Sequence, residues 1–274
     1  MLMIASTVCF TANVLLVRAL SQVETVNVWL VSCVRFLAGL AVLFVLYRRE
    51  CAYGRLFRHR KLAARGLVGG TGVYVFYLTI VHLGAGRATF INNTYVIFGA
   101  LLAVWMLGER FQPALAIGSA AALGGLALLT DVFGSGPSTN VYDLVAIFGA
   151  LASAYVVVTI RQLHATEHTA TIFAAQCVYG LILCTIPALL HLQSVSLVGW
   201  ATIIVAGVFA GLGQITMTHA FRDLPVAEGS LLQMLVPVGI AGGGVVFFQE
   251  RFAPHELLGA ALILGGTAFI AVRR

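Results

Sequence analysis

The pentapeptide Glu109-Arg110-Phe111-Gln112-Pro113 recurs 141 residues later as Glu250-Arg251-Phe252-Ala253-Pro254. The match extends beyond the pentapeptide, because ten of the 20 residues in 109–128 are identical at this shift. The segment before it aligns more loosely and places Asn92 on Gln233. A chain that matches itself over such a distance is predicted to consist of two copies of one structural unit.

The composition points to a membrane protein. Of the 274 residues, 60% are hydrophobic and 9% are charged, whereas about a quarter of the residues of an ordinary soluble domain are charged. A water-soluble protein of this size could not cover its surface with so few charged side chains. A soluble fold is therefore excluded, and the chain is predicted to be a polytopic membrane protein.

Ten membrane spans are predicted from the positions of the apolar segments. A spanning helix needs about 20 mostly apolar residues, and charged or turn-rich breaks divide the chain into ten such segments. They are residues 2–20, 27–47, 66–84, 88–107, 113–131, 142–161, 169–190, 197–219, 226–247 and 254–272. The predicted fold class is all-α, with ten transmembrane helices.

The duplication divides these spans into two repeats of five helices. The first repeat covers residues 1–133 and the second 142–274, with a linker at 134–141 that begins with a Gly/Ser/Pro-rich stretch. Because five is an odd number, the second repeat enters the membrane from the opposite side, so the two repeats are inverted. Secondary transporters use this arrangement to bind substrates near the middle of the bilayer. The architecture favours transport over a duplication without functional use.

Basic residues set the predicted orientation in the membrane. Seven of the 16 Lys and Arg residues lie in one short stretch, namely Arg48, Arg49, Arg55, Arg58, Arg60, Lys61 and Arg65. Basic loops stay on the cytoplasmic side, and with this loop inside, 12 basic residues fall in cytoplasmic segments and three outside. Both termini are therefore predicted to be cytoplasmic. We favour this explanation of the basic stretch over recognition of nucleic acid or anionic lipid.

Motifs for enzymatic or metal chemistry are incomplete. His255-Glu256 begins like the helix of a zinc protease, but Gly259 stands where the second histidine ligand is required. The sequence contains neither a Walker A motif nor a Gly-x-Ser-x-Gly elbow. The five cysteines form no CxxC pair, so we interpret them as packing residues. The prediction is a protein that is not an enzyme and that uses no cofactor and no metal.

These features together resemble a known transporter family. The paired Glu-Arg-Phe-x-Pro turns, each followed by a Gly-containing helix, and Arg35-Phe36-Leu37-Ala38-Gly39 in the second span are similar to the EamA-type drug/metabolite transporters. The short loops look most like those of bacterial inner-membrane exporters of amino acids, including aromatic ones. The resemblance implies alternating access through a central cavity, a small-molecule substrate and the lipid bilayer as surroundings. It implies no nucleic acid and no ATP-hydrolysing partner, and it leaves the exact substrate, the direction of transport and the oligomeric state open.

Polar side chains within the predicted spans are the candidates for substrate binding, because hydrocarbon penalises a polar group that has no partner. Amides donate and accept hydrogen bonds, which suits a zwitterion, and tyrosine combines an apolar ring with a polar tip. The candidates are Asn13, Tyr74, Tyr77, Asn92, Tyr95, Tyr155, Gln176, Tyr179, Gln214 and Gln233. For each residue alone, a hydrogen bond between helices is an equally good explanation.

A second group of residues is predicted to serve motion or ion coupling. Pro237 and Gly211 are candidate hinges, because proline and glycine weaken a helix. No Asp or Glu lies deep in a predicted span. The candidates for proton coupling or gating are therefore His82, His219 and Glu228 near span ends, although an interfacial position is the simpler explanation for each. The sequence favours facilitated export, with proton exchange unresolved.

The Glu-Arg turns are predicted to be structural, with Glu109, Arg110, Glu250 and Arg251 stopping the spans and capping neighbouring helix ends. Arg35, a basic residue well inside a predicted span, is also interpreted as structural. Two alternatives to amino-acid export remain. One is export of another metabolite or a drug-like compound, and the other, from a different class, is a membrane receptor or scaffold that binds a ligand without moving it.

Overall fold

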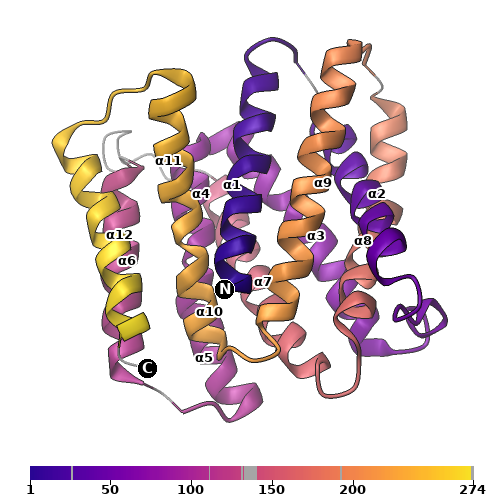
Figure 1. The fold of residues 1–274 in the computed structure, drawn as a ribbon, viewed down its shortest axis with the longest axis horizontal. Coiled ribbons are helices and arrows are strands. Elements are labelled where there is room, and N and C mark those ends of the chain that lie inside the picture. The colour runs from indigo at the N-terminus through magenta and orange to yellow at the C-terminus, as the bar shows by residue number, and fades with distance from the viewer. Residues whose placement is uncertain (26, 111, 131, 133–140, 192, 273–274) are drawn as a thin grey trace. The chain divides into compact units, whose positions relative to one another are not determined.

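A computed structural model describes residues 1–25, 27–110, 112–130, 132, 141–191 and 193–272. Every regular element in these ranges is a helix (Figure 1). The elements are α1 (Leu2–Ser21), α2 (Val28–Tyr47), the short 3-10 helix η1 (Tyr53–Arg55), α3 (Arg60–Leu83), α4 (Ala85–Asn93), α5 (Tyr95–Leu107), α6 (Pro113–Leu129), α7 (Val141–Leu163), α8 (Thr169–Leu190), α9 (Leu197–Ala220), α10 (Val226–Gln233), α11 (Leu235–Phe248) and α12 (Pro254–Val272). Of the predicted linker 134–141, residues 134–140 lie outside the described part of the chain.

The all-α prediction is confirmed for these residues, and several helices have the length and composition of membrane spans. Seven stretches of the described chain are apolar and long enough to cross a bilayer. They are α1, α2, α7, α8, α9 and the stretches Gly86–Leu107 and Val226–Phe248. Large apolar residues are exposed on them, such as Trp105 with a relative accessibility of 81% and Phe247 with 72%. Such surfaces fit lipid and would be unfavourable in water.

The third predicted span begins earlier than expected. Helix α3 starts at Arg60, six residues before the predicted start at residue 66. Residues 60–65 are Arg, Lys, Leu, Ala, Ala and Arg, all of which favour helix. A span predicted from hydropathy ends where charged residues begin, whereas the helical backbone can continue through them. Arg65 consequently lies inside a helix and not in the basic loop.

Two predicted spans are each interrupted in the middle. The span predicted at 226–247 is divided into α10 and α11 at Met234, three residues before Pro237. Proline has no N–H to donate to the carbonyl four residues earlier, which here belongs to Gln233, so the regular helix cannot continue through this turn. Pro237 is therefore the third residue of α11 and not the middle of a continuous helix.

The span predicted at 88–107 is divided into α4 and α5 at Thr94 without a proline. The Thr94 hydroxyl donates to the carbonyl of Ile91 at 2.6 Å, and the Thr94 N–H bonds the same carbonyl at 3.1 Å. Side chains that bond nearby carbonyls compete with the regular helical pattern. With the 141-residue shift, the two interruptions fall at equivalent places in the two predicted repeats, within one residue of each other.

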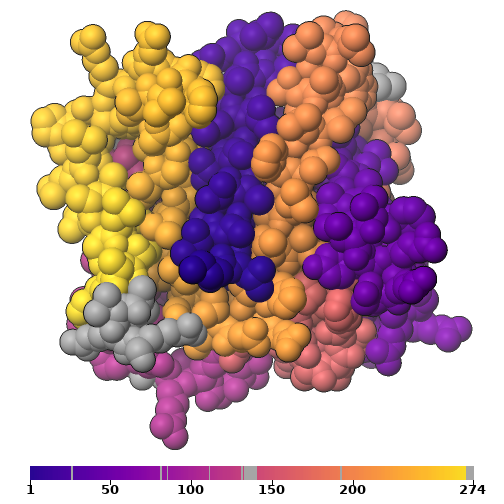
Figure 2. Space-filling model, viewed as in Figure 1, coloured from indigo at the N-terminus to yellow at the C-terminus, as the bar shows by residue number. Residues whose placement is uncertain are grey.

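The described residues form two compact units, which we treat separately. Unit 1 consists of Met1–Tyr74 and Thr159–Asp223, and unit 2 of Val75–Val158 and Leu224–Arg274. Each unit combines helices from both predicted repeats. In unit 1, α1 packs along α9, and α2 packs against α8 and α9. Figures 1 and 2 show indigo α1 beside orange α9.

Helices of unit 1 approach each other closely at glycines. Gly211 of α9 faces Gly39 of α2, and a Cβ added to Gly211 would lie 3.1 Å from the Gly39 Cα. Small residues at such crossings let two backbones come into contact. The candidate hinge Gly211 thus lies at a helix crossing.

In unit 2, α6 and α12 form the most extensive helix pair (Figure 1). A Cβ on Gly125 would lie 2.5 Å from the carbonyl oxygen of Gly259, and one on Gly266 would lie 2.8 Å from that of Gly118. In the 141-residue alignment, Gly118 is equivalent to Gly259 and Gly125 is equivalent to Gly266. The two contacts are therefore exchanged by the internal repeat, and we refer to them as the α6–α12 seam.

Candidate functional site

The predicted substrate-binding side chains are distributed over both compact units. Unit 1 holds Asn13, Tyr74, Gln176, Tyr179 and Gln214, and unit 2 holds Tyr77, Asn92, Tyr95, Tyr155 and Gln233. We describe which partners each set has within its own unit, because a polar group already paired with the protein is less available to a ligand.

Asn13 on α1 takes part in helix packing. It is buried, and its Nδ2 donates to the carbonyl of Ala206 on α9 at 2.9 Å. Two turns earlier on α1, the hydroxyl of Ser6 donates to the carbonyl of Gly213 at 2.8 Å. Both bonds run from α1 to α9 and satisfy polar groups that would otherwise be buried unpaired. Gln214 is buried one position further along α9.

The aromatic candidates of unit 1 contact other aromatic rings. Tyr74 stacks on Trp29 with ring centroids 3.8 Å apart. The Tyr179 hydroxyl donates to the carbonyl of Leu56 at 3.3 Å, and its ring lies against Phe57. Tyr179 therefore fixes the loop before α3 to α8.

Gln176 has a charged partner that the sequence did not indicate. Its Oε1 accepts a hydrogen bond of 2.9 Å from Nη2 of Arg65, and both side chains are buried. In the sequence, Arg65 is the last of a run of basic residues and looks like part of a loop. The signal that could have identified it is the helix-forming composition of residues 60–65.

Unit 2 places polar groups at its two interrupted helices. Asn92 lies in the last turn of α4, with its Oδ1 3.5 Å from the hydroxyl of Ser153 on α7. Gln233 is the last residue of α10 and is buried. Tyr95 begins α5, directly after the break at Thr94. Three of the predicted residues, Asn92, Tyr95 and Gln233, are thus found next to a break in a helix.

Small residues keep this part of unit 2 closely packed. A Cβ on Gly99 would lie 3.5 Å from side chains of Val157 on α7 and Val226 on α10. One on Gly149 would lie 3.9 Å from Oδ1 of Asn92. Helices α4, α5, α7 and α10 therefore meet around Asn92 and Ser230. Tyr77 and Tyr155 are partly buried in the same unit.

The titratable candidates lie at helix ends. Nδ1 of His82 lies 2.9 Å from the carbonyl of Leu78, and the exposed ring stacks on Tyr142 at 3.8 Å. His219 is partly buried in the last turn of α9, and Glu228 lies in the first turn of α10. Glu228 carries a negative charge at the positive end of that helix, which is a stabilising position.

A further histidine, His164, follows α7 and was not singled out from the sequence. Its Nε2 lies 2.8 Å from the carbonyl of Thr218. Burial lowers the pKa of His164, the bond to Thr218 opposes that shift, and the nearby His219 and Arg222 lower the pKa further. His164 is consequently neutral at pH 7 and acts as a structural donor to the end of α9.

The Glu-Arg turns lie between helices, and the Glu109 carboxylate accepts a hydrogen bond of 3.2 Å from the N–H of Val226 at the start of α10. Glu250 is partly buried, whereas Arg110 and Arg251 are exposed. The residues just before the two turns, Gly108 and Gln249, both adopt the left-handed conformation that ends a helix. The helices before the two turns therefore end in the same backbone conformation.

Replacing Glu109 with alanine is expected to lower the free energy of unfolding by about 1 kcal/mol, because α10 loses the acceptor for its first N–H. Thermal unfolding in detergent measures the change. Arg110→Ala, at the exposed neighbour, is the control and should stay near wild type. Equal effects of the two changes would show that Glu109 does not act as a cap.

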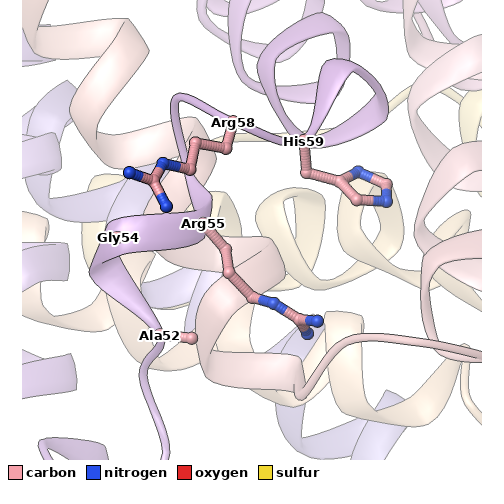
Figure 3. A pocket seen from close by; sticks show the side chains of 5 residues that line it. All are labelled: Ala52, Gly54, Arg55, Arg58 and His59. Carbon is pink, nitrogen blue, oxygen red and sulfur yellow. The ribbon is translucent and has the colours of Figure 1, made fainter.

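One surface pocket of about 600 Å³ opens in the basic segment of unit 1. It is lined by Ala52, Gly54, Arg55, Arg58 and His59. Arg55 is already paired with Glu167 at 3.2 Å, and the guanidinium groups of Arg55 and Arg58 diverge in Figure 3. An anion is bound most strongly where donors converge on it. We therefore do not assign this pocket to the substrate.

Comparison with known proteins connects this arrangement to transport. The model of the EamA-like transporter family matches residues 1–131 and 140–272. The "Pseudopaline exporter CntI" of Pseudomonas aeruginosa is 28% identical over 218 residues, which cover 78% of this chain and 74% of that protein. The "Probable terminal-alkyne amino-acid exporter" of Streptantibioticus cattleyicolor is 28% identical over 229 residues, with the same coverage. A solved structure described as "Crystal structure of protein" superimposes with a TM-score of 0.82 at 18% identity, over 99% of this chain and 95% of that one, and shows the same fold.

Proposed function

Since the chain belongs to the EamA-like transporter family, and is an exporter of metabolites and not an enzyme, we propose that it exports amino acids, including aromatic ones, by alternating access. We place it in the bacterial inner membrane with both termini in the cytoplasm. Ten crossings follow if α4 with α5, and α10 with α11, each count as one span.

The observation that carries this proposal is the pair of interrupted helices in unit 2. Both breaks occur within apolar stretches long enough to cross a membrane. Each break lies next to a side-chain amide, Asn92 in one and Gln233 in the other. Broken helices expose backbone groups that hydrocarbon cannot satisfy, and transporters tolerate them where they line a substrate site.

The contacts between helix ends support the proposed topology. If the spans alternate, Glu24 and Ser196 lie on one side of the membrane, and Arg55 and Glu167 lie on the other. Each of these pairs is joined by hydrogen bonds within unit 1. In unit 2, the bond from Val226 to Glu109 likewise joins two ends that alternation places on the same side.

The proposed inverted repeat is supported by the α6–α12 seam and by the family match. A two-fold axis between repeats requires that a contact from position i to position j be accompanied by one from j to i. The pairs Gly125–Gly259 and Gly118–Gly266 meet this requirement. The matched ranges 1–131 and 140–272 also begin and end close to the proposed repeat boundaries.

The substrate class is proposed from the polar groups and from the relatives. Amides at Asn92 and Gln233 can each bind either end of a zwitterion, and Tyr95 adds a ring for an apolar side chain. The two named relatives are described as exporters of pseudopaline and of a terminal-alkyne amino acid. Apart from Glu228 in the first turn of α10, the apolar stretches Gly86–Leu107 and Val226–Phe248 contain no Asp or Glu, which favours zwitterions over simple cations.

Counterflow in proteoliposomes tests the proposal. Purified protein is reconstituted with unlabelled phenylalanine or threonine inside, and uptake of the labelled amino acid from outside is measured with and without a pH gradient. We expect transient accumulation that requires the trapped amino acid and is indifferent to pH. Liposomes without protein and liposomes loaded with an unrelated sugar are the controls.

Three results would change the proposal. Absence of accumulation by folded protein with either amino acid would reject amino-acid export and redirect the search to other metabolites. Binding of phenylalanine without any flux would favour the receptor alternative. A strong dependence on the pH gradient would instead restore His82, His219 and Glu228 as coupling candidates.

A further inference from the structure

Arg65 carries a buried charge whose hydrogen-bonding capacity is largely unused. None of its surface is exposed, and its single hydrogen bond goes from Nη2 to Gln176. Nε and Nη1 are buried and have no hydrogen-bond partner among the residues that the structure describes. A guanidinium has five N–H donors and stays protonated in proteins.

The protein does not neutralise this charge in the structure described. The partner of Arg65 is a neutral amide, and its ionisable neighbour Cys177 on α8 is a thiol. Glu167, the buried acid of the same unit, is engaged by Arg55 instead. Burying an unpaired charge is unfavourable, so its retention requires a role in which the charge is matched.

The surroundings of Arg65 hold its guanidinium in one place. Gly69 lies one turn later on α3, and a Cβ there would overlap Nη1. Gln176 fixes Nη2 from α8 and packs against the same glycine. A guanidinium held in this way presents its remaining donors without further loss of side-chain entropy, which favours bidentate binding of a planar anion.

We propose that Arg65, positioned by Gln176, binds the carboxylate of the exported substrate. The inference rests on the proposed function and adds to it the residue that recognises the acid group. None of the Arg65 surface is exposed in this conformation, so the substrate reaches it in a conformation in which α3 and α8 separate beside it. A carboxylate is the ligand because it is the planar anion that every amino acid carries.

The test compares ligands with and without a carboxylate. Binding of phenylalanine and of phenylalaninamide, which lacks the acid group, is measured with purified protein, alongside counterflow of phenylalanine. Wild type should prefer phenylalanine by about 100-fold, the size expected for a buried charge-assisted pair. Arg65→Gln should remove this preference by weakening phenylalanine while leaving phenylalaninamide unchanged. Arg58→Gln removes the same charge from an exposed position of the same segment and should behave like wild type.

Gln176→Glu separates a binding role from a structural one. An internal carboxylate would pair with Arg65, so this variant should unfold at a higher temperature and yet lose phenylalanine affinity by about the same 100-fold. If Arg65 served stability alone, Gln176→Glu would be more stable and would still bind phenylalanine, which would overturn the inference.

The outcomes also separate this inference from the proposed function. Wild-type flux of phenylalanine with an unchanged preference in Arg65→Gln would reject the role of Arg65 and leave amino-acid export intact. No binding and no flux of any amino acid by wild type would reject the proposed function and the inference with it.

Discussion

Gly125→Val is expected to destabilise the protein more than any other single change considered, with a loss of about 3 kcal/mol or more in the free energy of unfolding. The reason is the α6–α12 seam. A Cβ at Gly125 would lie 2.5 Å from the carbonyl oxygen of Gly259 and 2.9 Å from the Cβ of Leu262. One of these groups is backbone and cannot rotate away, so the two helices would have to separate along their length.

Gly124→Val is the matched control, because a Cβ at Gly124 meets nothing within 4 Å. Unfolding in increasing SDS, followed by circular dichroism, gives the free energies of both variants. Gly124→Val should remain within about 0.5 kcal/mol of wild type, as expected for a substitution away from packed features. Similar losses in the two variants would mean that the seam is not packed as described.

Loss of the Arg87–Asp143 ion pair is expected to produce the second-largest effect. Nε and Nη2 of Arg87 donate to the two carboxylate oxygens of Asp143 at 2.9 and 2.8 Å. The side chains are 20% and 14% exposed, so the pair is largely withdrawn from water. It ties the start of α4 to the start of α7. Asp143→Asn leaves the guanidinium buried without its anion, and about 3 kcal/mol should be lost.

A charge-swapped double variant provides the check on this pair. Arg87→Asp combined with Asp143→Arg should recover part of the stability that each single reversal removes, because the attraction is restored. The coupling energy of this cycle contains the restored attraction and the like-charge repulsion that each single reversal introduces. Arg222 and Asp223 form a matched exposed pair, with side chains 62% and 72% exposed, and Asp223→Asn should cost less than about 0.5 kcal/mol. A coupling energy near zero for Arg87 and Asp143 would contradict the prediction.

Periodicity and hydropathy were sufficient to predict where most helices lie. The predicted span 169–190 coincides with α8, and 254–272 coincides with α12. These signals depend on local composition, because a helix that crosses the hydrocarbon core must consist of a long stretch of mostly apolar residues. The same signals could not predict the interruption at Thr94, because it arises from one hydroxyl bonding the carbonyl of Ile91 instead of from an apolar or charged break.

The sequence predicted which polar residues of the candidate site are buried. It did not predict the residues to which they form hydrogen bonds. Burial of Asn13, Gln176 and Gln233 follows from their positions in apolar helices. That Asn13 bonds Ala206, however, depends on a contact between residues 193 positions apart. Arg65 was missed because a basic run looks the same in sequence whether it lies in a loop or continues into a helix.

The α6–α12 seam has a consequence for how such a protein can originate. Since its two contacts are exchanged by the 141-residue shift, each of the two proposed five-helix repeats would contain both halves of the interface. An unfused gene product that inserted into the membrane in both orientations could pair with itself through the same glycines. Fusion of two such genes would fix one copy in each orientation, after which the copies are free to diverge. Arg65 of the proposed first repeat, for which the 141-residue shift gives Ala206, would be an example of this divergence.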